Sequence, residues 1–107
     1  METTSNPGKT TAIIAYLTII GWIIAFIMNN KDNNAFASFH IRQALGLILT
    51  YFAVSILISI TGIWMLSVLY LVVFVFVILG IVAAAQEEEK PVPVLGEYFQ
   101  DWFKTIG

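Results

Sequence analysis

Hydrophobic residues in this chain are gathered into long runs without charge. From Gln43 to Gln86 the sequence contains no Asp, Glu, Lys, Arg or His. A helix needs about 20 apolar residues to cross the hydrocarbon core of a bilayer, so this run is long enough for two crossings and a tight turn. A surface helix of a soluble protein would show a polar face over that length, and none is present. The run therefore predicts a membrane protein.

The apolar runs divide into three predicted transmembrane helices. The first covers about residues 10–28, is longer than the core of a cleaved signal peptide and lacks a small-x-small cleavage pattern after it, so we expect it to be retained. The second and third cover about residues 41–60 and 63–85, because Ser59–Gly62 holds the turn-forming residues of the charge-free run. The Val-rich third run is still expected to be helical, since main-chain groups in lipid must pair within their own segment.

These predictions give an all-α integral membrane protein with three transmembrane helices and a C-terminal amphipathic interfacial helix. Residues 1–9 are expected to form a flexible tail, residues 10–90 the transmembrane domain, and residues 91–107 a helix lying flat on the membrane. The apolar face of that last helix would consist of Leu95, Phe99, Trp102, Phe103 and Ile106.

Composition excludes several classes of function. The chain is 59% hydrophobic and only 11% charged, against about a quarter charged in soluble domains. A net charge of −2 gives no basic surface for nucleic acid, and the absence of cysteine removes disulfides and thiolate metal sites. No pair of residues forms an acid–base or nucleophilic site, and no small-molecule substrate is evident, so we expect no enzyme, cofactor or metal. The uncharged spans also argue against a proton-coupled transporter.

The distribution of basic residues predicts an orientation. With three spans, the four basic residues Lys31, Arg42, Lys90 and Lys104 lie on one side of the membrane and Lys9 lies on the other. Because Lys and Arg concentrate on the cytoplasmic side, this favours an outside N-terminus and an inside C-terminus.

Candidate contact residues lie at the two ends of the charge-free run. The segment from Ser38 to Gln43 could bind a lipid phosphate or hold a loop of a partner. Alternatively, it is an interfacial anchor in which Arg42 binds a phosphate or helix-end carbonyls. The residues predicted to contact a partner or lipid headgroups are His40, Arg42, Gln43, Phe99, Trp102 and Phe103.

Small and aromatic residues inside the spans indicate close packing. Gly21, Gly46 and Gly80 each open a small-x3-small pattern, which serves either packing within one chain or a homodimer face. Aromatic residues with a polar group that needs a partner also lie inside the spans, where helix packing is the simpler interpretation and a lipid or quinone site the alternative. They are Tyr16, Trp22, Tyr51 and Tyr70.

Two segments resemble a known family. The segment Phe36–Leu45 resembles the F-x-x-x-H-x-R-Q-A-L signature of small bacterial membrane proteins related to the twenty-kilodalton Tic subunit, an import component of the chloroplast inner envelope. Lys90–Gly96, with the aromatic residues that follow it, is similar to the end of the same family. The resemblance implies a helical membrane protein with a link to protein import in plastids. For this chain we expect a multi-pass protein of the bacterial inner membrane.

The function that follows is a small non-enzymatic membrane protein. We expect it to be a subunit or partner-binding component, embedded in the lipid bilayer, that forms a homo-oligomer or joins a larger membrane complex. The alternative, implied by the resemblance, is a component of a protein-translocation machine or a channel.

Overall fold

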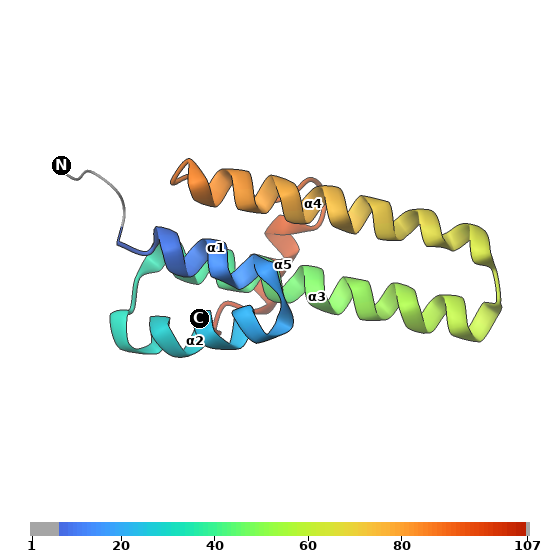
Figure 1. The fold of residues 1–107 in the computed structure, drawn as a ribbon, viewed down its shortest axis with the longest axis horizontal. Coiled ribbons are helices and arrows are strands. Elements are labelled where there is room, and N and C mark those ends of the chain that lie inside the picture. The colour runs from blue at the N-terminus through green and yellow to red at the C-terminus, as the bar shows by residue number, and fades with distance from the viewer. Residues whose placement is uncertain (1–6, 107) are drawn as a thin grey trace.

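The computed structural model describes residues 7–106, in which every regular element is a helix (Figure 1). This confirms the all-helical class. Most of the predicted tail at residues 1–9 lies outside the described residues, and the first helix begins at Lys9. The elements are α1 (Lys9–Leu17), α2 (Ile19–Asp32), α3 (Ala35–Thr61), the 3-10 helix η1 (Trp64–Ser67), α4 (Val68–Ala85) and α5 (Gly96–Trp102).

The charge-free run forms a hairpin of two long helices. Ala35–Thr61 and Trp64–Ala85 are the two helices in residues 7–106 that are long and apolar enough to cross a membrane. The turn between them falls where the sequence predicts it: Gly62 has φ 69°, and its N–H donates to the carbonyl of Ile58 at 2.8 Å. A positive φ favours glycine, which closes the helix without strain. α3 also takes in residues 35–40, because the side chain of Asn34 caps its first turn.

The first predicted span is not one helix. Thr18 is extended, with φ −159° and ψ 174°, and it divides residues 10–28 between α1 and α2. Its hydroxyl accepts from the N–H of Gly21 at 3.0 Å and so caps the start of α2. With 9 and 14 residues, α1 and α2 are about 14 and 21 Å long at the usual rise, less than the roughly 30 Å of a hydrocarbon core. The three-span prediction is therefore not confirmed, and residues 10–28 form parts of a short helical hairpin in place of one long helix.

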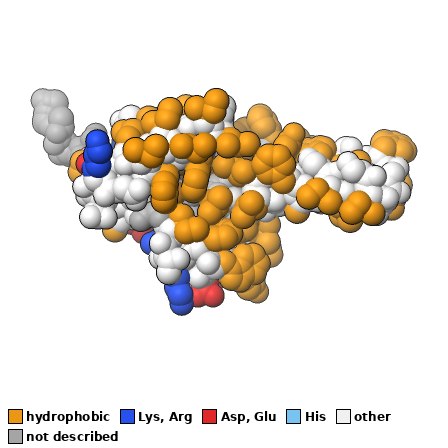
Figure 2. All heavy atoms as spheres, turned by 90° about the horizontal axis from the view of Figure 1, so that it is seen from below, with side chains coloured by type: hydrophobic (Ala, Val, Ile, Leu, Met, Phe, Trp, Pro, Cys, Tyr) orange, Lys and Arg blue, Asp and Glu red, His pale blue; other side chains and the backbone are white. Residues whose placement is uncertain are grey.

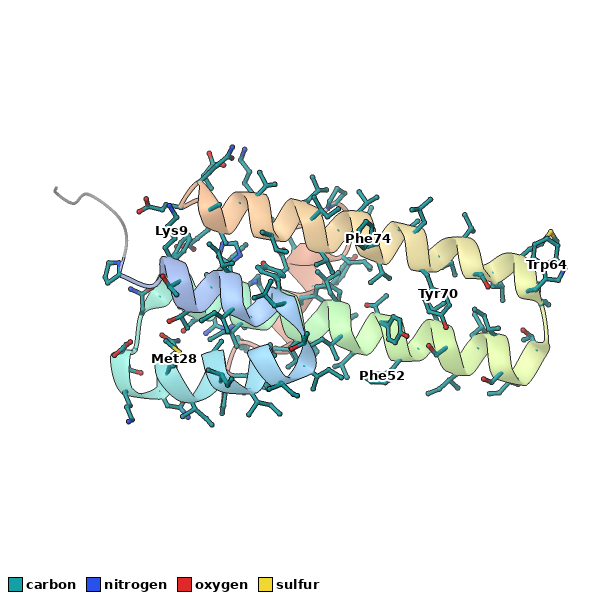
Figure 3. All side chains as sticks on the ribbon, in the orientation of Figure 1. Lys9, Met28, Phe52, Trp64, Tyr70 and Phe74 are labelled. Carbon is teal, nitrogen blue, oxygen red and sulfur yellow. The ribbon has the colours of Figure 1, made fainter. Side chains whose placement is uncertain are left out.

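The α1–α2 hairpin begins and ends at the same end of the molecule. Lys9 and Met28 lie near that end, and Trp64 lies at the opposite end (Figure 3). The segment that follows α4 returns there as well, since the carbonyl of Glu88 lies 2.8 Å from the His40 ring. No single long helix separates Lys9 from Lys31. The distribution of basic residues therefore no longer favours an outside N-terminus.

The hairpin covers only one half of the α3–α4 pair, so the molecule is wide at one end and narrow at the other (Figures 1 and 2). In the wide half, α1 and α2 pack on each other and α1 also packs on α3 and α4. Residues of the core there include Ala12, Tyr16, Ile41, Leu47 and Ala84. In the narrow half, α3 and α4 contact only each other and η1, and their remaining surface is apolar.

Two glycines in the long helices are slots for aromatic rings of the same chain. A Cβ placed on Gly80 would lie 2.5 Å from the ring of Tyr16, and one placed on Gly46 would overlap the ring of Phe99. Gly21 similarly faces the main-chain oxygen of Ile14. The glycines of all three small-x3-small patterns therefore pack within one chain.

The C-terminal helix is shorter and more deeply docked than predicted. α5 has 7 residues, because Pro91 and Pro93 hold the preceding segment out of a helix and Val94 adopts a positive φ of 68°. Phe99 is only 3% exposed and fills the Gly46 slot, so it does not face lipid. Tyr98 is 55% and Trp102 is 62% exposed. The expected continuous aromatic face is thus divided between the protein core and the outside.

Candidate functional site

Polar side chains are buried together where α1, α3 and the segment after α4 meet. We call Tyr16, His40 and Gln43 the polar cluster. Tyr16 is 7% exposed, and His40 and Gln43 are 0% exposed. The two α3 residues lie on the same side of that helix, three positions apart, and face Tyr16 of α1. Three aromatic rings, those of Tyr16, Phe36 and Phe39, meet the His40 ring edge to face.

Hydrogen bonds run through the polar cluster in one direction. The Gln43 Nε2 donates to the Tyr16 hydroxyl at 2.9 Å, and that hydroxyl lies 2.5 Å from His40 Nδ1. On the other side of the ring, His40 Nε2 lies 2.8 Å from the carbonyl oxygen of Glu88. A carbonyl can only accept, so Nε2 carries the hydrogen, and a neutral ring then accepts from Tyr16 at Nδ1. Each of these groups is satisfied without a buried charge.

The polar cluster also holds the irregular segment that follows α4. Gln43 Oε1 accepts from the N–H of Val92 at 2.8 Å, while its Nε2 lies 3.4 Å from the carbonyl of Lys90. Together with His40 and Glu88, these bonds pair main-chain groups that have no helix of their own. Non-helical main chain near lipid is tolerated only when protein groups or water satisfy it. The cluster therefore acts as a substitute for secondary structure.

Arg42 binds the chain's own C-terminal segment. Its Nε donates to the carbonyl of Ile106 at 2.8 Å, and its terminal nitrogen donates to the carbonyl of Lys104 at 3.1 Å. Gln100 of α5 donates in turn to α3, from its Nε2 to the carbonyl of Phe39 at 2.7 Å. Main-chain carbonyls are thus the partners of Arg42 in the structure, and its contact with a phosphate or a partner stays a prediction.

The six predicted contact residues separate into two groups. His40, Gln43 and Phe99 are buried against the chain itself, and Arg42 binds the C-terminal segment. Trp102 is exposed and Phe103 is partly exposed beside it. Contact with a partner or with headgroups stays a prediction for these residues, and Trp102 presents the largest outward surface.

Several side chains of this site have hydrogen-bond partners that the sequence did not predict. Asn29 is 1% exposed and donates to the Ser38 hydroxyl at 2.8 Å, which joins α2 to α3. The indole of Trp22 donates to the carbonyl of Ile41 at 2.8 Å. In the sequence each of these is a polar group inside an apolar run. Such a group is expected to have a hydrogen-bond partner, but its position does not identify that partner.

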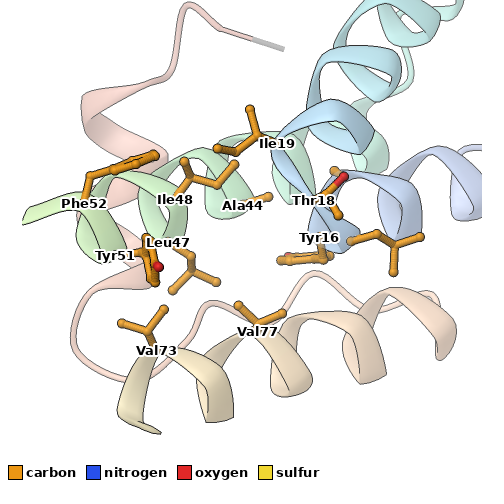
Figure 4. Close-up of a pocket in the computed structure, with 12 residues that line it drawn as sticks. Tyr16, Thr18, Ile19, Ala44, Leu47, Ile48, Tyr51, Phe52, Val73 and Val77 are labelled. Atoms are coloured by element: carbon orange, nitrogen blue, oxygen red, sulfur yellow. The ribbon is translucent and has the colours of Figure 1, made fainter. Parts of the chain in front are cut away.

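An apolar cleft of about 550 Å³ opens beside the tip of the α1–α2 hairpin (Figure 4). It lies between the hairpin and the α3–α4 pair, and Leu47, Val73 and Val77 form part of its wall. Thr18 and Tyr51 add hydroxyl groups at its edge. Its chemistry suits hydrocarbon, and it provides no acid–base pair for catalysis.

The charged groups lie outside the polar cluster. Glu88 and Lys90 form an ion pair at 3.2 Å, but their side chains are 42% and 68% exposed, so the pair adds little stability. Among residues 7–106, no three His, Asp or Glu side chains come together as a metal site.

The fold and the polar cluster define a small helical membrane protein whose short hairpin and C-terminal segment are tied to one long helix. Residues 7–99 match the MamF/MmsF family, described as the magnetosome magnetite crystal formation protein family. The chain belongs to this family. The predicted relation to the Tic import component is wrong, because the family that matches nearly the whole chain is a different one. No curated protein and no solved structure matches the chain.

Proposed function

We propose that this chain is a non-enzymatic membrane component that takes part in magnetite crystal formation as a structural subunit of a membrane complex. Family membership supports the process, since the family is described by it. The observation that carries the structural role is the closure of the polar cluster. Gln43, Tyr16 and His40 satisfy one another and the main chain at Glu88 and Val92. Their purpose is to hold the chain in shape, and the outer surfaces are left for lipid and partners.

In this proposal α1 and α2 form a re-entrant hairpin that enters one leaflet and returns. The outward side of α2 supports this position, because Ile20, Ile24 and Ile27 are 70%, 47% and 53% exposed. A stripe of isoleucine of this size is unfavourable in water and favourable in lipid. The charged residues of α2 are the last two, Lys31 and Asp32, which would lie at the membrane surface.

We further propose that both described ends of the chain face the cytoplasm. With a re-entrant hairpin, all five basic residues fall on one side, whereas the three-span arrangement divides them four to one. The positive-inside rule then places that side in the cytoplasm of a bacterial inner membrane, or on the outer face of a vesicle derived from it. The residues are Lys9, Lys31, Arg42, Lys90 and Lys104.

Cysteine labelling tests this topology, since the chain has no native cysteine. Lys9→Cys, Asp32→Cys and Ile63→Cys variants are exposed to a membrane-impermeant thiol reagent, first on intact cells and then after lysis. We expect intact cells to label Ile63→Cys alone, with the other two labelled after lysis. Labelling of Lys9→Cys but not of Asp32→Cys from outside would restore the three-span arrangement.

The surface proposed for a partner is formed by Tyr98 and Trp102. Their rings lie 5.5 Å apart on the exposed side of α5, which Phe99 fixes to α3. Exposed aromatic residues on a rigid element are favourable anchors for a protein interface. A photo-crosslinking residue at Trp102 is expected to capture a protein in native membranes. The matched control is Val68, which is 61% exposed at the narrow end.

The role in crystal formation is tested by replacement. In a magnetite-forming bacterium, the gene of a resident family member is deleted and this chain is expressed in its place. We expect crystal dimensions, measured by electron microscopy, to be restored by the parent chain and not by a Trp102→Ala variant present at equal level in the membrane. Unchanged crystals in the presence of membrane-inserted parent chain would exclude the role.

A further inference from the structure

We propose that this protein is selective for curved membranes, and that it favours bilayers in which the leaflet at its charged end is the convex one. The inference rests on the re-entrant position proposed for α1 and α2. It goes beyond the role in crystal formation, because it assigns a preference for a lipid surface that needs neither iron nor a protein partner.

The two halves of the molecule have unequal cross-sections. In the wide half α1, α2 and α5 lie beside the α3–α4 pair, whereas the far half consists of α3, η1 and α4 (Figures 1 and 2). Each helix is about 10 Å across with its side chains. The α1–α2 hairpin therefore adds an area of the order of 160 Å² to one half of the molecule.

The area that the hairpin adds lies in lipid. The apolar part of α2, Ile19–Met28, would extend about 15 Å at the usual rise, which is the thickness of one hydrocarbon leaflet. Its outer isoleucines Ile20, Ile24 and Ile27 are 70%, 47% and 53% exposed. α2 turns back at Thr18 and does not continue into the second leaflet.

α5 packs on α3 beside the hairpin. It crosses behind α3 near the middle of the molecule, roughly at right angles to the long helices (Figure 1). Arg42 and Gly46 fix its place along α3. Tyr98 and Trp102 are exposed on the outer side of α5. Because α5 packs on α3 at Gly46, beside the tip of the α1–α2 hairpin, it adds width to the same half of the molecule as the hairpin does.

The unequal area of the two halves gives the protein a preference for curved bilayers. A protein that occupies more area in one leaflet than in the other relieves packing stress where that leaflet is expanded, and insertion of this kind is sensitive to curvature. On a closed vesicle the expanded leaflet is the outer one. The chain should therefore concentrate on small vesicles when its charged end faces outward.

The test uses the full-length chain, fluorescently labelled at an introduced Lys9→Cys site and reconstituted into vesicles of mixed size. Protein density per unit area is measured vesicle by vesicle, and quenching by an impermeant reagent identifies molecules whose charged end faces outward. We expect density to be several-fold higher on the smallest vesicles than on the largest for outward-facing molecules. Equal density at all sizes would overturn the proposal.

A pair of variants tests whether the lipid-embedded hairpin causes the enrichment on small vesicles. Ile20→Lys with Ile24→Lys draws α2 out of the hydrocarbon and should remove most of the enrichment. Ile20→Leu with Ile24→Leu keeps the apolar surface and should preserve it. If the lysine variant does not insert, a Tyr98→Ala and Trp102→Ala variant replaces it and is expected to lose part of the enrichment. Full enrichment in an inserted lysine variant would also overturn the proposal. Because no crystal or partner is present, these results are independent of the replacement experiment.

Discussion

The two halves of the molecule are stabilised by different means. In the wide half, polar side chains are completely enclosed, as with His40 and Gln43 at 0% exposure, and they bind main chain that has left its helix. In the narrow half, Ile60 and Trp64 are each 77% exposed and the helices carry their own hydrogen bonds. Lipid is as apolar as these side chains, so helix association gains little from apolar contact. Hydrogen bonds and steric fit should therefore matter most in the wide half.

Gln43→Leu is the change expected to separate the halves most clearly. It leaves the N–H of Val92 buried without an acceptor and removes the donor to Tyr16, and each unsatisfied group costs about 1–3 kcal/mol. We expect the free energy of unfolding in detergent to fall by about 2–4 kcal/mol, with the segment after α4 becoming accessible to protease. Gln86→Leu is the control, since that side chain is exposed. Equal loss in both variants would contradict a special role for the cluster.

Gly46→Ala tests the steric fit between α3 and α5, where the ring of Phe99 packs against Gly46. The new Cβ would overlap the ring of Phe99, and overpacking of this kind costs about 1–3 kcal/mol. We expect α5 to leave its slot, which increases hydrogen exchange across Gly96–Trp102 while α4 is unaffected. Adding Phe99→Leu to Gly46→Ala makes room and should recover part of the loss. No change in exchange at α5 would show that the slot is not what holds it.

A pair of tyrosine variants gives the smallest effect and the finest comparison. Tyr70→Phe removes a hydrogen bond to Ser55 in the narrow half, 2.7 Å long, and bonds between membrane helices contribute only about 0.6 kcal/mol on average. Tyr16→Phe removes the group that joins His40 to Gln43 and should cost at least twice as much. Thermal unfolding in one detergent measures both. A larger loss for Tyr70→Phe would reverse the ranking of the two halves.

Local features that need no distant partner were predictable. The charge-free run and the turn at Gly62 each follow from adjacent residues. The need of Tyr16 and Trp22 for partners was also predictable, because a polar group in an apolar run must be satisfied. Which partners they bind was not, since His40 and Ile41 come from another helix.

The break at Thr18 shows why the first span was mispredicted. Threonine in an apolar helix commonly bonds the carbonyl four residues earlier, as Thr50 and Thr61 do here with Gly46 and Leu57. Thr18 instead turns its hydroxyl forward to the N–H of Gly21 and starts a new helix. Both outcomes are compatible with the local sequence. The family resemblance was also misleading, because the short signature in Phe36–Leu45 is not enough to identify a family.

By itself the sequence determined that this protein is helical, that it belongs in a membrane and where its long hairpin turns. These properties follow from the hydropathy of continuous segments and the need of each main-chain group in lipid for a partner in its own helix. The tertiary structure alone decided that the first apolar run folds back and that the polar residues face each other. Those outcomes depend on contacts between segments far apart in the chain, such as His40 with Glu88 and Gly46 with Phe99.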